Sequence, residues 1–245
     1  MPDTVLDHAW GGWRILATGL SFALFGIGGV VLRVAVFPVM TLVVPGPARA
    51  AAARAIIRLS FRTFVGVMRF LGVLRYEVHG LGKLARHGQL ILANHPTLID
   101  TVFLMAFVRN ADCIVKGALW DNVVTGGPVR AAGYIRNDDG PQLVDDCVAS
   151  LHAGGNLIVF PEGTRTAQGG MPVLRRGAAH IAVRGRQAVT PVVISCHPPT
   201  LGKGEKWWQV PPRQARFRID VMDDIGMDRF TGAGISDIVA ARRLT

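Results

Sequence analysis

The stretch Gln89-Leu90-Ile91-Leu92-Ala93-Asn94-His95-Pro96-Thr97-Leu98-Ile99-Asp100 carries the clearest fold signal of the chain. Residues 89–93 are a short, mostly apolar run, which is typical of a buried strand. Proline fits the first turn of a helix and forces the residue before it, here His95, into an extended conformation. The stretch therefore predicts a strand, a short turn and a helix that begins near Thr97.

The same alternation of apolar runs and helical stretches continues along the chain from residue 73. We expect strands at Leu74–Val78, Gln89–Ala93, Cys113–Val115, Leu157–Phe160, Val189–Ser195 and Arg216–Val221. We expect helices at Thr97–Val108, Pro141–His152 and Arg175–Arg184, and a short one at Ser236–Arg243 that Ser236 caps. Strands that alternate with helices predict an α/β fold, a mixed and mostly parallel sheet flanked by helices.

The N-terminal part of the chain has a different composition. Ile15–Leu32 are 18 residues without a formal charge, and as a helix they would be about 27 Å long, close to the ~30 Å of a bilayer core. A second apolar run, Val34–Val44, is interrupted by Pro38. Ala48-Arg49-Ala50 fits the cleavage site of a signal peptide. The length of the apolar stretch and the acidic residues before it favour a retained anchor, either one span or a re-entrant hairpin in one leaflet.

We therefore divide the chain into an N-terminal membrane-anchoring helical region, residues 1–75, and an α/β domain, residues 76–245. Arginines follow the first apolar run, which predicts that the downstream side faces the cytoplasm. Arginines far outnumber lysines, which favours a GC-rich bacterial gene and hence the inner (cytoplasmic) membrane of a bacterium. Cys113, Cys147 and Cys196 are widely spaced, and we expect neither a disulfide framework nor a metal site from them.

The chain is basic and apolar at once. It has 27 Lys and Arg against 17 Asp and Glu, a net charge of +10, and 50% hydrophobic residues among its 245, so disordered and fibrous classes are excluded. Such a charge attracts nucleic acid, anionic membrane or phosphorylated substrate. On a helix predicted over Ala48–Leu74, Arg54, Arg58, Arg62 and Arg69 fall on one side. A basic amphipathic helix beside an apolar run favours the membrane surface and predicts no nucleic-acid partner.

Two polar segments could carry chemistry. In the first, Asp100 lies five residues after His95, about one turn into the predicted helix, so its carboxylate can reach the imidazole. A carboxylate on one ring nitrogen leaves the other free to accept a proton. The chain has no Gly-x-Ser-x-Gly segment for a serine nucleophile, so this pair would activate the hydroxyl of a substrate, or water.

The second segment is Phe160-Pro161-Glu162-Gly163-Thr164-Arg165, at the carboxyl end of a predicted strand. Ligands of α/β sheets bind at that end. The guanidinium of Arg165 has the geometry that binds phosphate, and Gly163 allows the backbone to approach an anion closely. Taken alone, each segment also fits a structural role, a histidine at a helix start or a turn with a surface ion pair.

Together, the two segments resemble the motifs of the PlsC-like glycerophospholipid acyltransferases. Asn94–Asp100 is similar to the family's His-x4-Asp motif and Phe160–Arg165 to its glycerolipid-binding motif, and the resemblance runs from Tyr76 to Val193. It includes Lys116-Gly117, Gly133-Tyr134-Ile135, Arg175-Arg176-Gly177 and Thr190-Pro191-Val192-Val193-Ile194. One motif departs from the pattern: an arginine commonly follows Gly-x-Ile-x-x, whereas this chain has Arg136 directly after Ile135.

The resemblance implies an acyltransferase fold for the α/β domain. It implies transfer of a fatty acyl group from acyl-CoA or acyl carrier protein to the sn-2 hydroxyl of 1-acyl-glycerol-3-phosphate (lysophosphatidic acid), with no cofactor or metal. His95 would be the base, oriented by Asp100, and backbone amides at the start of the next helix would stabilise the oxyanion. The substrate-binding residues would be Asn94, Arg136, Glu162, Gly163, Thr164, Arg165 and Pro191.

Three alternatives remain open at this point. The acceptor can be another lysophospholipid, a lyso-ornithine-type lipid or a specialised lipid, because the shifted Arg136 leaves phosphate recognition uncertain. Water in place of the acceptor would make the protein a hydrolase. A non-catalytic, membrane-bound lipid-binding scaffold would keep the fold without the reaction.

Overall fold

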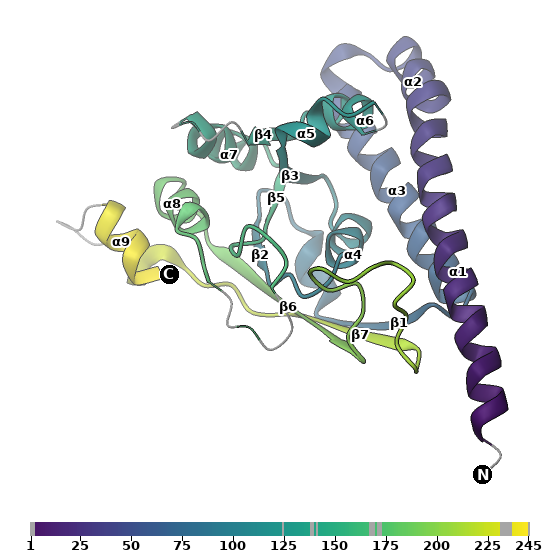
Figure 1. The fold of residues 1–245 in the computed structure, drawn as a ribbon. Helices are drawn as coiled ribbons and strands as arrows, with labels where there is room; N and C mark the ends of the chain where they lie inside the picture. The colour runs from purple at the N-terminus through teal and green to yellow at the C-terminus, as the bar shows by residue number, and fades with distance from the viewer. Residues whose placement is uncertain are drawn as a thin grey trace.

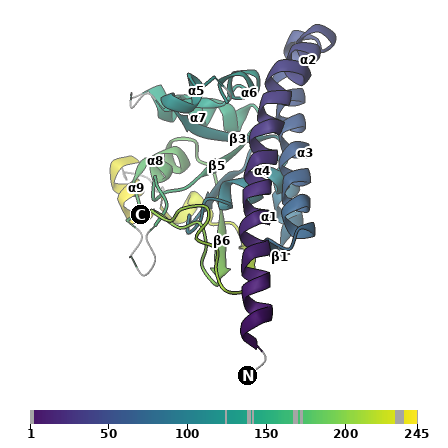
Figure 2. The same cartoon turned by 45° about the vertical axis from the view of Figure 1, so that its right-hand side comes forward.

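A computed structural model describes residues 3–123, 125–137, 140, 142–166, 170, 173–230 and 237–244 (Figure 1). It has a sheet with helices on both faces and a long helical arm along one side (Figures 1 and 2). The predicted start of one helix at Pro141 and the predicted cap Ser236 lie outside the described residues.

The helical arm begins with α1 (Asp3–Val31), continues through a π-helical segment (Leu32–Val36) and ends with α2 (Phe37–Val43). Pro38, which interrupts the second apolar run in the sequence, does not end the helix. Proline lacks the N–H for an α-helical bond, and the wider π-helical turn before it lets the helix continue: the Phe37 N–H donates to the Leu32 carbonyl. By length and composition, the 33 residues Gly11–Val43, with a mean hydropathy of 2.2, are long and apolar enough to cross a membrane.

A 3₁₀ turn (Gly46–Ala48) reverses the chain into α3 (Arg49–Phe70), which runs back beside α1 (Figures 1 and 2). Phe25 of α1 packs against Phe61 and Phe64 of α3, with ring centroids 6.0 and 5.1 Å apart. One side of α3 thus supports the arm, and another side packs on the α/β domain through α4 (Asp100–Phe107).

The sheet has seven strands in the order β1-β7-β6-β2-β5-β3-β4. Their bounds are β1 (Leu74–His79), β2 (Leu90–Ala93), β3 (Ala111–Lys116), β4 (Ile135–Asn137), β5 (Asn156–Val159), β6 (Val189–His197) and β7 (Ala215–Val221). Every neighbouring pair is parallel except β6 and β7. The prediction of an α/β fold with a mixed, mostly parallel sheet is confirmed, although β4, which has three residues, was not predicted.

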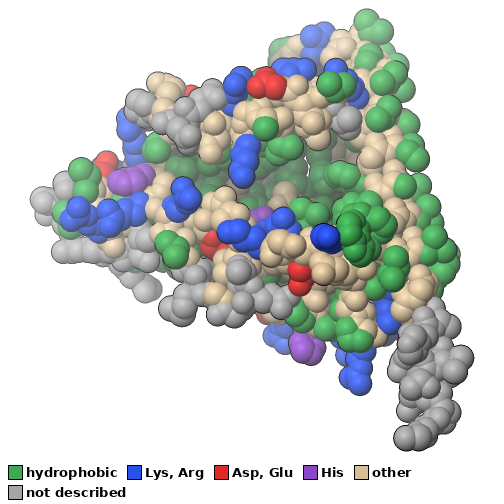
Figure 3. All heavy atoms as spheres, viewed as in Figure 1, with side chains coloured by type: hydrophobic (Ala, Val, Ile, Leu, Met, Phe, Trp, Pro, Cys, Tyr) green, Lys and Arg blue, Asp and Glu red, His purple; other side chains and the backbone are tan. Residues whose placement is uncertain are grey.

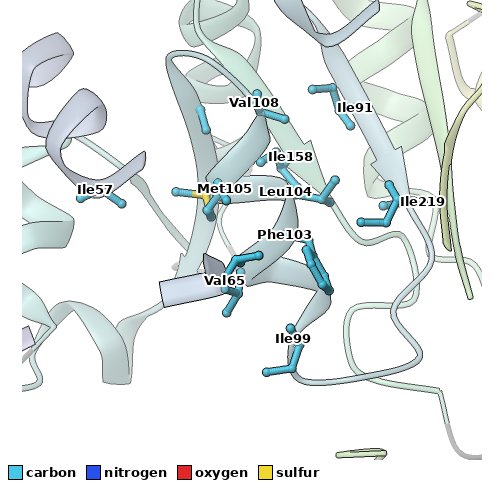
Figure 4. Packing of buried hydrophobic residues seen from close by; sticks show 14 of the residues in the cluster. Ile57, Val65, Ile91, Ile99, Phe103, Leu104, Met105, Val108, Ile158 and Ile219 are labelled. Atoms are coloured by element: carbon cyan, nitrogen blue, oxygen red, sulfur yellow. The ribbon is translucent and has the colours of Figure 1, made fainter. Parts of the chain in front are cut away.

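Helix α4 lies buried between α3 and the sheet (Figure 4). Phe103, Leu104 and Ala106 are fully buried in it, so this helix is apolar on every side, as expected of a helix enclosed by protein. On the opposite face of the sheet, α7 (Gln142–His152) and α8 (Gly177–Arg184) cover a second apolar cluster. The remaining helices are α5 (Gly117–Trp120), α6 (Gly126–Ala131) and α9 (Asp237–Leu244), with 3₁₀ turns at Leu81–Ala85 and Met227–Arg229.

The predicted basic stripe of α3 needs one correction at Arg54. Its Nη2 lies 2.8 Å from Asp112 Oδ2 on β3, and its Nε donates to the Ala132 carbonyl at 2.9 Å. Burial raises the pKa of Asp112, and the Arg54 charge opposes that rise. Arg54 therefore joins α3 to the sheet and is mostly buried against it, and turning it away would leave the Asp112 carboxylate buried and unpaired, which is costly.

Candidate active site

The two polar segments meet at one edge of the sheet. They follow β2 and β5, which are parallel neighbours with Leu92 opposite Val159. The ring of Phe160 stacks on the imidazole of His95, with centroids 4.2 Å apart and an interplanar angle of 23°. Parallel strands bring their carboxyl ends to the same edge, so the sheet joins segments that are more than sixty residues apart in sequence.

His95 and Asp100 form the pair that the sequence predicts. His95 Nδ1 lies 3.0 Å from Asp100 Oδ2, and the Asp100 side chain is fully buried while that of His95 is 15% exposed. A carboxylate only accepts hydrogen bonds, so Nδ1 carries the proton and Nε2 is left with a lone pair. The arrangement can take a proton from a group that approaches Nε2.

Thr97 locks the Asp100 carboxylate, and the sequence analysis missed this residue. The Thr97 N–H donates to Asp100 Oδ2 at 2.6 Å, and the Thr97 hydroxyl donates to Oδ1 at 2.7 Å. The bond from the Thr97 N–H to Asp100 is one half of a capping box, for which Thr-x-x-Asp before an apolar run was the available signal, whereas the Thr97 hydroxyl donates to the same carboxylate and accepts the Ile99 N–H. Helix α4 accordingly begins at Asp100 and not at Thr97 as predicted, because residues 96–99 form a turn before it.

The backbone amides of this turn are already occupied. The N–H of His95 donates to Glu162 Oε1, that of Leu98 to the Leu201 carbonyl, and that of Ile99 to the Thr97 hydroxyl. Thr97 donates to Asp100, and Pro96 has no N–H. Each of these donors thus has an internal acceptor, and the role of backbone amides at the start of the helix in stabilising an oxyanion stays a prediction.

Glu162 ties the two loops together. Its side chain is buried, one carboxylate oxygen accepts the His95 N–H at 3.1 Å, and the other accepts the Thr166 hydroxyl. The Thr166 N–H in turn donates to the His95 carbonyl at 3.1 Å. Glu162 was predicted to bind substrate; the contacts that the structure gives it are internal, and they position the backbone of His95.

Asn94 and Pro191 lie in the sheet beside the site. The Asn94 side chain donates to the Ile194 carbonyl at 2.8 Å and accepts the Ile194 N–H at 2.6 Å. It thereby continues the pairing of β2 with β6 beyond the end of the strand. Pro191 lies opposite Leu92 within β6. Roles of these two residues in substrate binding stay predictions.

The loop after β5 leaves an exposed surface at Gly163 and Thr164. Gly163 has φ +70°, and a Cβ at this position would lie 2.9 Å from Arg175 Nε. Only glycine therefore lets the Arg175 side chain lie against the loop. Arg175 is exposed, and its backbone N–H donates to the Pro161 carbonyl at 2.7 Å. The sequence analysis recorded Arg175 as part of a motif but did not name it as a site residue.

Arg165 and Arg136 are both held by protein groups. Arg165 Nη1 donates to the carbonyls of Leu201 and Gly202, at 2.9 and 2.8 Å, which fixes the guanidinium and leaves Nε and Nη2 as its other donors. Arg136 lies on β4, three strands from β2, and its Nη2 is 3.6 Å from Asp121 Oδ2. The structure thus brings Arg165 to the site and places Arg136 farther along the same sheet edge.

A small apolar pocket of about 30 Å³ lies between α1, α3, β7 and the β6–β7 loop. Ile99, next to Asp100, and Leu201 line it on the side of the site, and Phe22 of α1 and Phe64 of α3 line it on the side of the arm. Figure 3 shows Lys and Arg side chains around a hollow in the face seen in Figure 1. The site therefore adjoins both an apolar space and a basic surface.

Among the residues that the structure describes, no group of three or more His, Cys, Asp or Glu side chains is placed to hold a metal ion. The expectation that no cofactor is needed stays a prediction. Burial and the nearby charge of Asp100 raise the pKa of the Cys196 thiol to about 12, which keeps this cysteine protonated and chemically inert near neutral pH.

The sequence of the region that holds this site is similar to that of known acyltransferases. Residues 75–195 match the acyltransferase family. The chain is 29% identical over 140 residues to the 1-acyl-sn-glycerol-3-phosphate acyltransferase of Pseudomonas aeruginosa, covering 54% of this chain and 53% of that protein. It is 27% identical over 154 residues to 1-acyl-sn-glycerol-3-phosphate acyltransferase alpha of Mus musculus, covering 59% of this chain and 54% of the relative. The match thus spans about half the length of these relatives.

A solved structure extends the likeness of the fold to nearly the whole chain. The crystal structure of the 1-acyl-sn-glycerophosphate acyltransferase PlsC from Thermotoga maritima superposes with a TM-score of 0.73. It is 19% identical in sequence, and the match covers 94% of this chain and 92% of that one. The fold is therefore shared over the arm as well as the α/β domain. Both motif-bearing loops lie within residues 75–195, the part of this chain that matches the acyltransferase family, and the fold is similar to that of a PlsC acyltransferase.

Proposed function

We propose that this protein is a membrane-associated O-acyltransferase that moves a fatty acyl group from acyl-CoA or acyl carrier protein to the sn-2 hydroxyl of lysophosphatidic acid, giving phosphatidic acid. The observation that carries the proposal is the contact of His95 Nδ1 with the buried, doubly anchored carboxylate of Asp100. The names of the relatives, which act on 1-acyl-sn-glycerol-3-phosphate, support the choice of acceptor.

His95 is the general base of the proposed reaction. Its Nε2 takes the proton of the acceptor hydroxyl as the hydroxyl oxygen attacks the carbonyl carbon of the thioester. Asp100 stabilises the imidazolium that forms. The tetrahedral intermediate then expels the thiol sulfur, which receives the proton from Nε2, and the products are the ester and the free thiol. Thr97 holds the Asp100 carboxylate and Glu162 holds the backbone of His95, so the base is already oriented before the acceptor binds.

The acceptor phosphate is bound at the loop after β5 in this proposal. Arg165 contributes its remaining donors, Arg175 contributes an exposed guanidinium above Gly163, and Thr164 adds a hydroxyl beside them. Two guanidinium groups at one glycine-containing loop suit a phosphate dianion, because each offers paired donors to its oxygens. In this proposal an acyl chain lies against the apolar side chains beside Ile99; the pocket there, about 30 Å³, is too small to enclose it.

Residues 1–75 form the membrane anchor of the proposal, and residues 76–245 the acyltransferase domain. The arm packs along the domain, through α3 and through contacts of α2 with α6. A helix of about 50 Å that crossed the bilayer upright would draw the attached domain into the ~30 Å core. The packing therefore favours a helix that lies in one leaflet. From the sequence, the proposal keeps the site at the cytoplasmic face of a bacterial inner membrane and includes no nucleic-acid partner.

The test is acyl transfer by the purified protein from labelled acyl-CoA, and from acyl carrier protein, to a panel of lysolipids. We expect product from lysophosphatidic acid with wild type and none with His95→Ala. Product from another lysolipid only would keep the chemistry and replace the acceptor. No product from any donor and acceptor, with folded protein in vesicles, would leave the scaffold as the better explanation.

The same chemistry on another acceptor is a second candidate, and Arg136 is the observation that favours it. The family places an arginine two positions later in this motif, and here the Arg136 side chain lies beside Asp121 at the sheet edge. An acceptor with a larger or uncharged headgroup would need no phosphate contact at that point. The lysolipid panel separates the two candidates directly.

A further inference from the structure

The β6–β7 loop, residues 198–214, connects the site to the helical arm. At its start, the carbonyls of Leu201 and Gly202 hold Arg165, and the Leu201 carbonyl also accepts the Leu98 N–H at 3.0 Å. Gly202 is fixed in turn, since its N–H donates to Glu205 at 2.8 Å. This end of the loop is therefore part of the wall of the site.

The other end of the loop is attached to α1. Trp207 packs on Gly19, where a Cβ would come within 3.1 Å of its ring, and its ring centroid lies 6.4 Å from that of Phe22. Arg14 Nη2 donates to the Pro212 carbonyl at 2.6 Å. Figure 2 brings α1 to the front, with the loop beside it.

Between these attachments, the loop presents two tryptophans to the outside. Trp207 and Trp208 are 43% and 48% exposed and pack edge to face with centroids 5.5 Å apart. The ammonium of Lys206 lies 5.1 Å from the Trp208 centroid. Two adjacent tryptophan rings that face only water leave a large apolar surface hydrated, which is unfavourable. Exposed tryptophans beside a lysine are typical of the boundary between lipid and water, where the ring is in an apolar layer and the polar group stays wet.

The tryptophan pair continues an apolar surface of α1. Exposed apolar side chains recur along that helix at intervals of three and four residues: Leu16, Leu20, Leu24, Ile27 and Val31. Gly19, on which Trp207 packs, directly precedes Leu20 and lies one turn after Leu16. Figure 3 shows apolar side chains along the arm and in front of it.

We propose that Lys206, Trp207 and Trp208 bind the surface of a phospholipid bilayer at the depth of the headgroups, beside α1. The proposal rests on the membrane anchor of the proposed function. A bilayer fits better than a protein partner because of charge. Lys203, Lys206 and Arg213 flank the tryptophans in the sequence, Lys206 lies over Trp208, and the one acid of the loop, Glu205, accepts the Gly202 N–H. Basic side chains around interfacial aromatics favour anionic headgroups.

The contact has a consequence at the site. The loop that touches lipid also holds Arg165, so docking at the bilayer fixes the arginine where a lysolipid enters from the membrane. Trp208 acts here as a positioning residue: through the loop it holds Arg165 in place, and it lowers the apparent KM for an acceptor that enters from the bilayer. A water-soluble acceptor with a short chain does not depend on it.

The first test measures depth and needs no turnover. A nitroxide is attached at Trp208→Cys or, as control, at His152→Cys, an exposed position of α7, in the full chain bound to vesicles of phosphatidylcholine and phosphatidylglycerol. Label-treated wild type gives the background from the native cysteines. We expect collisions of the label at 208 with oxygen to rise and those with a water-soluble nickel chelate to fall relative to 152. Equal access of the chelate to both labels would overturn the proposal.

The second test compares acceptors. Trp208→Ala should raise the apparent KM for long-chain lysophosphatidic acid in vesicles several-fold and leave the KM for a short-chain soluble analogue unchanged, while Trp208→Tyr should retain most of the wild-type KM. An equal rise for both acceptors would indicate a structural role and overturn the proposal. If wild type transferred no acyl group, the proposed function would fail, and the depth measurement would still decide the membrane contact.

Discussion

Two loops at the same edge of the sheet are built in opposite ways. In the loop after β2, every backbone N–H from His95 to Ile99 has an internal acceptor, and the Asp100 carboxylate is buried. In the loop after β5, Gly163, Thr164 and Arg175 are exposed. The difference teaches that the loop after β2 holds the proton-transfer pair rigidly before substrate binds. The loop after β5 keeps its donors exposed, so that they can bind an anion.

The largest effect is expected at the preorganised loop. Replacing His95 by Ala removes the base, and kcat should fall about 10²–10⁴-fold, the usual contribution of a general base. Asp100→Asn should lose a comparable factor because the amide cannot stabilise the imidazolium. Single-turnover acyl transfer by vesicle-bound protein measures both. A His95→Ala variant with unchanged kcat would remove the histidine from the mechanism.

Glu162→Gln tests the link between the two loops. The amide keeps one acceptor and replaces the other by a donor, so the bonds to the His95 N–H and to the Thr166 hydroxyl lose the carboxylate charge, and one of them must reverse or break. Because hydrogen bonds to charged groups contribute about 1.5–3 kcal/mol, thermal or denaturant unfolding should show a loss of that order, and kcat should fall more than KM rises. Glu77→Gln on the exposed side of β1 is the matched control. If Glu162 instead contacts substrate, KM will change and stability will not.

At the open loop, Arg175→Ala should raise the apparent KM for lysophosphatidic acid about tenfold, which corresponds to about 1.4 kcal/mol, and leave kcat nearly unchanged. The neighbouring Arg176→Ala is the control, because Arg176 is also exposed but does not lie on Gly163. Steady-state kinetics at several acceptor concentrations decide between them. Equal KM values for the two variants would locate phosphate binding elsewhere, with Arg165 the next candidate.

The smallest effect concerns Cys196, whose thiol pKa burial raises to about 12. Only the thiolate is nucleophilic, so iodoacetamide at pH 7.5 should leave acyl transfer unchanged. The rate of modification should rise about tenfold per pH unit above neutrality, because the thiolate fraction does so until the pH reaches the pKa. Mass spectrometry of the alkylated protein measures the rate. Rapid modification at pH 7.5 would contradict the burial of this side chain.

Much of the fold follows from local sequence. Each of the six predicted strands corresponds to a strand of the sheet, because short apolar runs bounded by turns encode buried strands directly. Strand β4 escaped prediction since Ile135–Asn137 is too short to show a period. The start of α4 was placed three residues early because Pro96 marks a helix start, whereas residues 96–99 form a turn that the contacts of Thr97 with Asp100 hold.

The sequence by itself determined the α/β alternation, the apolar arm and the two motifs with His95, Asp100 and Arg165, because periodicity and short spacing are local properties. Only the tertiary structure decided which distant groups meet: Arg54 with Asp112, Glu162 with the His95 amide, and Trp207 with α1. Each of these contacts joins elements whose mutual position depends on the packing of the whole sheet. No local pattern encodes such a position, so the contacts appear only when the chain is folded.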